Sequence, residues 1–292
     1  MIDASNCVIC EGRIRRRRRA MVAPFLARRV WDRAPFTVDL VQCDSCGFLF
    51  YNPRLDDQEA QRLYNNYRSE EYQRMRQSAE PWYTVKFNAD LASPESYVHR
   101  RARLAELLRQ HLGQRPIRRI LDFGGDRGDL VAGLIPGAEA FVYDISGIPA
   151  VDGVTAAADP AACQADLVIN SNVLEHVGFP RRLVAQILKA APAEGLVFLE
   201  VPCEKPLGWP RMARRMAQVG VVCLTRPGLG LALVRPSSLY MMHEHINYYT
   251  EQSLAALMRA SGCKVLAAGA YYLEGRAGKG DMAWCLGVAP AR

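Results

Sequence analysis

A glycine-rich turn between two apolar segments is the feature that most constrains the fold of this 292-residue chain. The first segment, Arg119–Phe123, has the character of a buried strand and runs directly into the turn. The second, Ala140–Tyr143, is followed at once by Asp144, 22 residues after Asp122. A strand, a turn that opens a helix, and a second strand ending in an acid form the start of a nucleotide-binding α/β unit.

The pattern of strands alternating with helices continues to the end of the chain. Helices are expected at 97–112, 180–191 and 251–261, and further strands at 165–170, 195–202, 264–270 and 281–288. Such alternation implies a parallel, doubly wound sheet. The predicted fold class is therefore α/β, with a Rossmann-like sheet.

Two Cys-x-x-Cys pairs lie near the N-terminus, Cys7 with Cys10 and Cys43 with Cys46. Zn²⁺ takes four thiolates in a tetrahedron, and each pair places two sulfurs on one tight turn. Gly47 suits such a turn, and an alternating strand leads into the second pair. We expect a small zinc ribbon with a structural Zn²⁺, although a redox dithiol is the rival interpretation.

These features predict three regions. Residues 1–52 form the zinc-binding module, 53–95 a helical, tyrosine-rich connecting segment, and 96–292 the sheet domain with an insertion at 203–240. The boundary before the sheet domain is expected at Ser93–Pro94. Tyr67 and Tyr72 of the connecting segment are candidate substrate-binding residues, with amphipathic packing as the alternative for each.

Composition sets broad limits on location and partners. Half of the residues are hydrophobic, no apolar run is long enough to span a membrane, and no secretory signal core is present, so a cytoplasmic location is expected. The formal charge of +7, most visible at Arg15–Arg19, favours an anionic partner. A solvated arginine cluster explains the same charge, and nucleic acid is not favoured on charge alone.

The residues of the turn suggest how a cofactor binds. Glycines let the backbone approach a ligand, and amides at the start of a helix face a carboxylate. Asp144 is placed to accept both hydroxyls of a ribose. This pattern alone does not separate NAD from S-adenosylmethionine.

The segment Asn172–Val177, after the expected fourth strand, makes that separation. Together with Ile120–Gly128 and Ile187–Pro202, it resembles the class I S-adenosylmethionine-dependent methyltransferases, over roughly Ile120–Val288. The resemblance implies S-adenosyl-L-methionine as cofactor and a structural role for His176. The cofactor-binding residues that it implies are Asp122, Gly124, Gly125, Arg127, Gly128, Asp144 and Asn172.

One position departs from that family. The middle glycine of its first motif is Asp126 here, where a side chain crowds the methionine end of the cofactor. Arg127 is expected to compensate by pairing with the cofactor carboxylate or with Asp126.

The segment Met242–Thr250, with the N-terminal cysteine pairs, resembles sugar C-methyltransferases and related sugar methyltransferases. By position, the family's active-site glutamate and histidine correspond to Glu244 and His245, whereas its tyrosine corresponds to Met242. The chain is also too short for the extra C-terminal domain of the C-methyltransferases. Methylation of oxygen or nitrogen on a nucleotide-linked sugar, or on another small polar metabolite, is therefore favoured over methylation of carbon.

The expected chemistry needs alignment and the removal of one proton. His245 suits the role of general base, with Glu244 orienting it or binding a hydroxyl. The alternative is that His243 and His245 cap the following helix or bond to backbone. A metal site on the two histidines is disfavoured because the sequence shows no further ligand cluster beside them.

The insertion at 203–240 is expected to lie over the carboxyl ends of the strands, as a lid. A short helix from Trp209 to Gly220 carries Arg211 and Arg214, which are candidates for binding substrate phosphates. A basic amphipathic helix also suits a membrane surface.

Two other functions remain open. An RNA base methyltransferase would use the Arg15–Arg19 run against phosphates, but leaves the His-Glu-His stretch unexplained. A non-catalytic protein of the same fold is the third hypothesis, and the intact Asp144 and Leu-Glu-His turn argue that it would still bind the cofactor.

Overall fold

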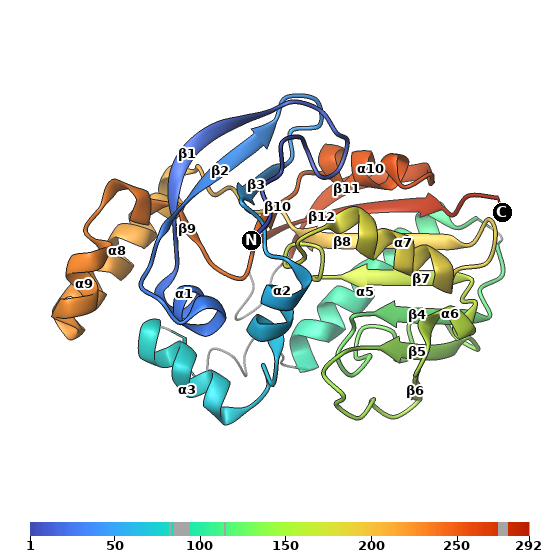
Figure 1. Ribbon diagram of the computed structural model, residues 1–292. Helices are drawn as coiled ribbons and strands as arrows, with labels where there is room; N and C mark the ends of the chain where they lie inside the picture. The colour runs from blue at the N-terminus through green and yellow to red at the C-terminus, as the bar shows by residue number, and fades with distance from the viewer. Residues whose placement is uncertain (82, 85–93, 114, 274–279, 292) are drawn as a thin grey trace. The chain divides into compact units, whose positions relative to one another are not determined.

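The computed structural model describes residues 1–292 except 82, 85–93, 114, 274–279 and 292 (Figure 1). The chain forms two compact units. Unit 1 comprises Met1–Lys86, Glu175–Gly178 and Glu204–Tyr248, and unit 2 comprises Phe87–Leu174, Phe179–Cys203 and Tyr249–Arg292. Each unit therefore draws on segments that are far apart in the sequence.

Unit 2 contains a seven-stranded sheet with strand order β11-β12-β8-β7-β4-β5-β6. Its strands are β4 (Arg119–Phe123), β5 (Glu139–Tyr143), β6 (Val154–Ala156), β7 (Leu167–Ser171), β8 (Leu196–Pro202), β11 (Lys264–Leu273) and β12 (Gly280–Val288). Its helices are α5 (Pro94–His111), α6 (Pro160–Cys163), α7 (Pro180–Ala190) and α10 (Glu251–Ala260). This order, with helices between the parallel strands, confirms the predicted Rossmann-like α/β fold.

The central strands of this sheet are buried on both faces. Ile120, Ile169 and Phe198 join a core with leucines of α5. Leu121, which follows Ile120, and Val197, which precedes Phe198, are also fully buried. Because successive side chains of a strand point to opposite faces, apolar layers cover both sides of the sheet.

Two predictions for unit 2 differ from the structure. The five strands from β8 to β6 are parallel as predicted, but β12 pairs with β8 and β11 in antiparallel fashion. The helix expected to begin at the glycine-rich turn does not form, and residues 124–137 run through successive turns and bends. The glycines at 124, 128, 133 and 137 all have positive φ, which explains why a regular helix is not maintained there.

Unit 1 is built on a five-stranded sheet with strand order β10-β3-β2-β1-β9. Its strands are β1 (Ile14–Val22), β2 (Thr37–Cys43), β3 (Leu49–Asn52), β9 (Met241–Met242) and β10 (Asn247–Tyr248). Its helices are α1 (Pro24–Trp31), α2 (Asp57–Tyr64), α3 (Glu70–Ala79), α8 (Trp209–Thr225), α9 (Pro227–Leu233) and the 3₁₀ turn η1 (Pro236–Leu239). The sheet thus joins strands from the N-terminal region to strands that follow the insertion.

The arginine run belongs to a strand of this sheet. β1 pairs antiparallel with β2, and a register shift falls between Arg16 and Arg18. Arg15 pairs with Asp44 at 2.9 Å, and Arg19 pairs with an aspartate of β2. Carboxylates therefore already balance part of the charge that the sequence offered for phosphate binding.

The connecting segment and the insertion also differ in detail from expectation. The tyrosine-rich stretch is two helices, and Tyr67 lies between them; a capping box of Asp56 and Glu59 begins α2. The insertion helix continues past Gly220 to Thr225. Of the boundary expected at Ser93–Pro94, Ser93 lies outside the described residues. In the described part of the chain, no helix has the length and apolar character needed to cross a bilayer.

Candidate functional site

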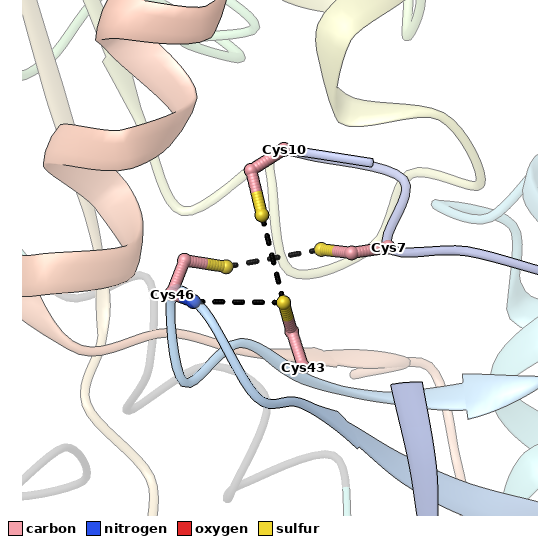
Figure 2. A group of neighbouring side chains, drawn as sticks. All are labelled: Cys7, Cys10, Cys43 and Cys46. Carbon is pink, nitrogen blue, oxygen red and sulfur yellow. Dashed lines mark hydrogen bonds between the residues drawn. The ribbon is translucent and has the colours of Figure 1, made fainter. Parts of the chain in front are cut away.

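The four cysteines of the two pairs converge at one end of the unit 1 sheet (Figure 2). The sulfurs of Cys7 and Cys46 are 3.8 Å apart, and those of Cys10 and Cys43 are 3.5 Å apart. A tetrahedral Zn²⁺ with Zn–S bonds of about 2.3 Å separates its sulfurs by about 3.8 Å. The spacing therefore fits a four-thiolate zinc site.

The backbone around the cysteines is arranged to support thiolates. The amides of Ser45 and Cys46 point to the sulfur of Cys43, at 3.4 and 3.5 Å. A Cβ on Gly12 would lie 2.5 Å from the Ser45 hydroxyl oxygen, so the approach of the two knuckles requires glycine there. Gly47 has a φ of +75°, as expected for the turn after Cys46. These contacts fit a closed set of four metal-binding thiolates.

In unit 2, the carboxylate of Asp144 organises the glycine-rich turn. Its Oδ2 accepts the Asp126 amide at 2.9 Å, and its Oδ1 accepts the Ser146 amide at 2.7 Å. The Gly124 amide donates to the carbonyl of Tyr143 at 2.7 Å, which joins the ends of β4 and β5. The acid that the sequence assigned to a ribose therefore also holds the turn in place.

The glycines of the turn have little room for a side chain. A Cβ on Gly125 would lie 2.1 Å from the carboxyl carbon of Asp122. Gly124 and Gly128 have φ of +79° and +80°, and a Cβ on either would lie 2.7 Å from a valine methyl group. The turn is thus a cradle that only glycine can line at these positions.

Asp126 has a φ of +56°, the left-handed conformation for which the family's glycine is suited. Aspartate tolerates this region better than most residues. Its carboxylate accepts a hydrogen bond from the Ser146 hydroxyl at 3.3 Å. The neighbouring Arg127 is exposed, and its predicted pairing with the cofactor carboxylate or with Asp126 stays a prediction.

Two buried oxygen atoms near the cradle have no hydrogen-bond partner among the described residues. They are Oδ1 of Asp122 and Oδ1 of Asn172, and Asn172 also has a positive φ of 58°. Burial raises the pKa of Asp122 to about 7. Buried polar atoms are normally satisfied, so unpaired atoms at a glycine-lined turn fit a site that receives a polar ligand.

Unit 1 brings together a second polar site, here called the histidine cluster: His176, Glu204, Glu244 and His245. Nδ1 of His245 lies 3.1 Å from Oε1 of Glu204. The two histidine rings meet edge to face with centroids 4.7 Å apart, and Nδ1 of His176 lies 3.2 Å from the carbonyl oxygen of Glu244. Glu244 and His245, which the sequence predicted as site residues, therefore lie with Glu204 and His176, which it did not predict.

Glu244 is held by two side chains of α3. Tyr72 donates to its Oε1 at 2.5 Å, and Arg76 donates to its Oε2 at 2.6 Å. Tyr72 and Arg76 are four residues apart and therefore lie on one face of the helix. Of the two tyrosines predicted to bind substrate, Tyr72 joins the cluster, whereas Tyr67 packs at the edge of the unit 1 core against Tyr64.

The turn that carries His176 is fixed to the strand β10. The Glu175 carbonyl accepts the amides of Ile246 and Asn247, at 2.9 and 3.1 Å. Arg54, which is 1% exposed, bonds Asn247 Oδ1 at 2.6 Å and the Val177 carbonyl at 3.1 Å. This support places His176 beside His245, although 69 residues separate them in the sequence.

Comparison with known proteins identifies the family. Residues 97–268, more than half of the chain, match the family model of a methyltransferase domain. The chain belongs to this methyltransferase family. No curated protein matches it.

The solved structures that match this chain have low sequence identity to it. One is the 1,6-didemethyltoxoflavin-N1-methyltransferase of Burkholderia thailandensis, with 14% identity and a TM-score of 0.49, over 87% of this chain and 95% of that one. Another is the magnesium protoporphyrin IX methyltransferase of Synechocystis PCC 6803 with bound S-adenosylmethionine, with 14% identity and a TM-score of 0.45, over 81% of this chain and 99% of that one.

The pKa values of the two histidines in the histidine cluster are shifted in opposite directions. Burial, and then the neighbouring His245, lower the pKa of His176 to about 3. Burial also lowers the pKa of His245, but the hydrogen bond and charge of Glu204 outweigh it, so that this pKa lies above its ordinary value of 6.5. At neutral pH His176 is therefore neutral, and of the two histidines His245 holds a proton more strongly.

The remaining predicted residues have other contacts. Arg211 pairs with Glu204 at 2.5 Å, and Arg214 is exposed. His243 bonds to Glu80 at 2.7 Å, and Thr250 caps α10, so neither histidine of the stretch acts as the helix cap. The sequence interpretation discounted His176 and missed Glu204 and Arg76. The four-residue spacing of Tyr72 and Arg76, and the place of Glu204 just after β8, are the signals that could have revealed them.

The sequence interpretation also missed a trio of metal-ligand residue types. Glu175, His176 and His245 have ligand-type atoms that all lie within 4.8 Å of one another. The trio includes His245 but not His243, so the expectation that a metal site on the two histidines is disfavoured stays a prediction. The other members of the trio come from a segment that is distant in the sequence.

Proposed function

We propose that this methyltransferase transfers a methyl group from S-adenosylmethionine to oxygen or nitrogen of a small polar acceptor, with a nucleotide-linked sugar as the favoured class. Unit 2 binds the cofactor, and the histidine cluster of unit 1 binds the acceptor and removes its proton. The observation that carries the proposal is the pairing of His245 with Glu204 beside a Glu244 held by Tyr72 and Arg76.

The residues of the cradle fit the cofactor. Asp144 is placed to accept ribose hydroxyls, and the glycines at 124, 125 and 128 leave room for the methionine end. Asp122 and Asn172 supply the buried, unpaired oxygen atoms that a polar ligand would satisfy. The bound cofactor supplies a methyl group on a sulfonium, which needs no further activation.

The tautomer of His245 follows from its partner. An ionised carboxylate only accepts hydrogen bonds, so Nδ1 of His245 carries the hydrogen that faces Glu204. With the cofactor bound, Nε2 would hold the lone pair that takes the acceptor's proton as the methyl group passes from the sulfonium to the acceptor atom. Glu204 also stabilises the imidazolium that forms. Arg211 pairs with the second carboxylate oxygen of Glu204 and so holds this side chain in position.

Other groups in the cluster suit a polyhydroxylated acceptor. Glu244 is an acceptor for a substrate hydroxyl and is held in place by Tyr72 and Arg76. The buried Tyr64 hydroxyl has no hydrogen-bond partner among the described residues, and its ring lies 5.9 Å from that of His176. Burial raises the pKa of Tyr64 well above its usual value, so this hydroxyl stays protonated and is a donor.

The cysteine cluster completes the proposal as a structural Zn²⁺ site formed by Cys7, Cys10, Cys43 and Cys46. A closed set of four thiolates leaves no open position for substrate, so we assign the metal to folding of unit 1 and not to the reaction.

A panel of nucleoside-diphosphate sugars incubated with the protein and S-adenosylmethionine tests the acceptor class. We expect one sugar to gain a methyl group, detected by mass spectrometry, with matching formation of S-adenosylhomocysteine. His245→Ala should greatly slow that product, and His99→Ala, an exposed histidine of α5, should not. Cofactor turnover with RNA and with none of the sugars would overturn the proposal.

A further inference from the structure

The helix α8 has an apolar face that is exposed. Its outward face consists of exposed apolar or small residues, and Trp209, Met216 and Leu224 are 72%, 55% and 86% exposed. This face, here called the α8 face, comprises Trp209, Ala213, Met216, Ala217, Gly220, Val221 and Leu224. At 100° per residue these positions span about 140° of the helix circumference.

The opposite side of α8 holds both apolar and charged residues. Val222 is fully buried, Arg215 is only 8% exposed and Arg211 is paired with Glu204, whereas Arg214 is exposed. A surface helix ordinarily turns its apolar residues inward. The apolar side chains of the α8 face are exposed in addition to that inner side, and their exposure costs free energy in water.

The neighbouring helix α9 does not cover this face. It packs on another side of α8, where a Cβ on Gly230 would lie 2.4 Å from the Cα of Cys223. Figure 1 shows α9 next to α8. Directly after α9, Val234 is 64% exposed and is followed by the exposed Arg235. An exposed apolar residue and an exposed basic residue therefore follow the helical pair.

The charge around the α8 face has one sign. Between Lys205 and His243 the sequence contains no aspartate or glutamate, whereas Arg214 and Arg235 are exposed. An apolar face with a tryptophan and a basic border matches the layered chemistry of a lipid surface, where acyl chains lie beneath anionic headgroups. A symmetric dimer through this face would instead bring the same basic border against itself.

We propose that the α8 face docks this protein on a bilayer surface that contains anionic phospholipid. Trp209, Met216 and Leu224 enter the boundary between headgroups and acyl chains, and Arg214 and Arg235 contact the headgroup phosphates. The inference does not depend on the identity of the methyl acceptor. It assigns the insertion a role in placing the enzyme at a membrane surface.

Vesicle flotation with the full-length, zinc-loaded protein tests this surface. We expect the protein to float with vesicles of phosphatidylcholine and phosphatidylglycerol, more weakly with phosphatidylcholine alone, and less as salt is raised. Met216→Glu with Leu224→Glu should reduce binding at least about tenfold, since both side chains lose their apolar insertion. The matched control is Leu266→Glu, which changes an exposed leucine of β11 in unit 2 and should leave binding unchanged.

Charge reversal provides an independent variant at exposed positions. Arg214→Glu with Arg235→Glu should weaken binding to anionic vesicles and leave the thermal melting curve unchanged. Failure of the wild type to float would overturn the proposal, as would equal flotation of the wild type and the Met216→Glu, Leu224→Glu variant. A concentration-dependent dimer in sedimentation equilibrium that the same apolar substitutions abolish would assign the face to a second copy of the chain instead.

Discussion

The cofactor cradle of unit 2 and the histidine cluster of unit 1 are built in different ways. The cradle comes largely from two neighbouring strand ends and uses glycines, backbone amides and one carboxylate. The cluster takes side chains from α3, the turn at 175–178, the start of the insertion and the segment before β10. Local backbone geometry makes the first site, and long-range packing makes the second.

This difference teaches which functions tolerate change. A site made of backbone atoms depends on a few residues that permit the required conformation, whereas a site made of side chains depends on each partner separately. We therefore expect substitutions in the cradle to act on cofactor affinity, and substitutions in the cluster to act on the rate of methyl transfer.

The largest expected effect concerns the zinc proposed for the four cysteines of unit 1. Cys43→Ser should remove the bound zinc and unfold unit 1, because such sites contribute roughly 10–16 kcal/mol to the folding of small modules. Metal analysis by mass spectrometry and circular dichroism measure both effects. Cofactor binding by unit 2 should persist, which separates the two units experimentally.

Cys163→Ser, in α6 of unit 2, is the matched control and should retain its metal. Wild-type protein should hold one zinc per chain. A second equivalent that Glu175→Gln removes would show that the trio of Glu175, His176 and His245 also binds metal. That result would take His245 out of the role of general base.

The next effect concerns the cradle. Asp144→Ala removes the acceptor of two backbone amides and the partner proposed for the ribose, so cofactor binding should be lost in titration calorimetry. Asp152→Ala, an exposed aspartate of a nearby loop, should bind normally. Normal affinity in Asp144→Ala would show that the cofactor is held elsewhere.

The cluster should respond in the opposite way. His245→Ala is expected to slow methyl transfer by about 10²–10⁴-fold, the usual contribution of a general base, while cofactor affinity stays at the wild-type value. Single-turnover kinetics with saturating cofactor measure the rate directly. An unchanged rate would remove His245 from the mechanism.

The smallest effect is a shift in pH dependence. Protonated His245 cannot accept a proton, so the rate should fall as pH falls through its pKa, which Glu204 holds above 6.5. Glu204→Gln removes the charge that raises this pKa, and the acid limb of the rate profile should move to lower pH with a reduced maximum. A limb that stays in place would mean that Glu204 does not act on the base.

The same contrast explains how far the sequence could predict the molecule. Strand ends, glycines and Asp144 lie close together in the chain, so the sheet and the cradle were predictable from local pattern. The helix expected after Gly128 did not form, because four glycines in left-handed conformations interrupt it. The antiparallel pairing of β12 with its neighbours depends on tertiary contacts, and the hydrophobic periodicity of the sequence does not predict strand direction.

Only those members of the histidine cluster that lie in a segment resembling sugar methyltransferases could be predicted. Glu244 and His245 were found in that way, and Tyr72 was named among the tyrosines. Glu204 and Arg76 were not found, because nothing local shows that a carboxylate after β8 or an arginine of α3 will face a histidine stretch far along the chain. His176 was discounted since its neighbour His245 is apparent only in the fold.

The most direct test of the central claim uses methyl-labelled S-adenosylmethionine. The pure protein is incubated with the label and with cell extract separated into small-molecule and RNA fractions. Label in the small-molecule fraction, greatly reduced with His245→Ala, is the predicted result and yields a product to identify. Label in RNA, or no label in either fraction although cofactor binding is confirmed, would contradict the assignment of a small-molecule methyltransferase.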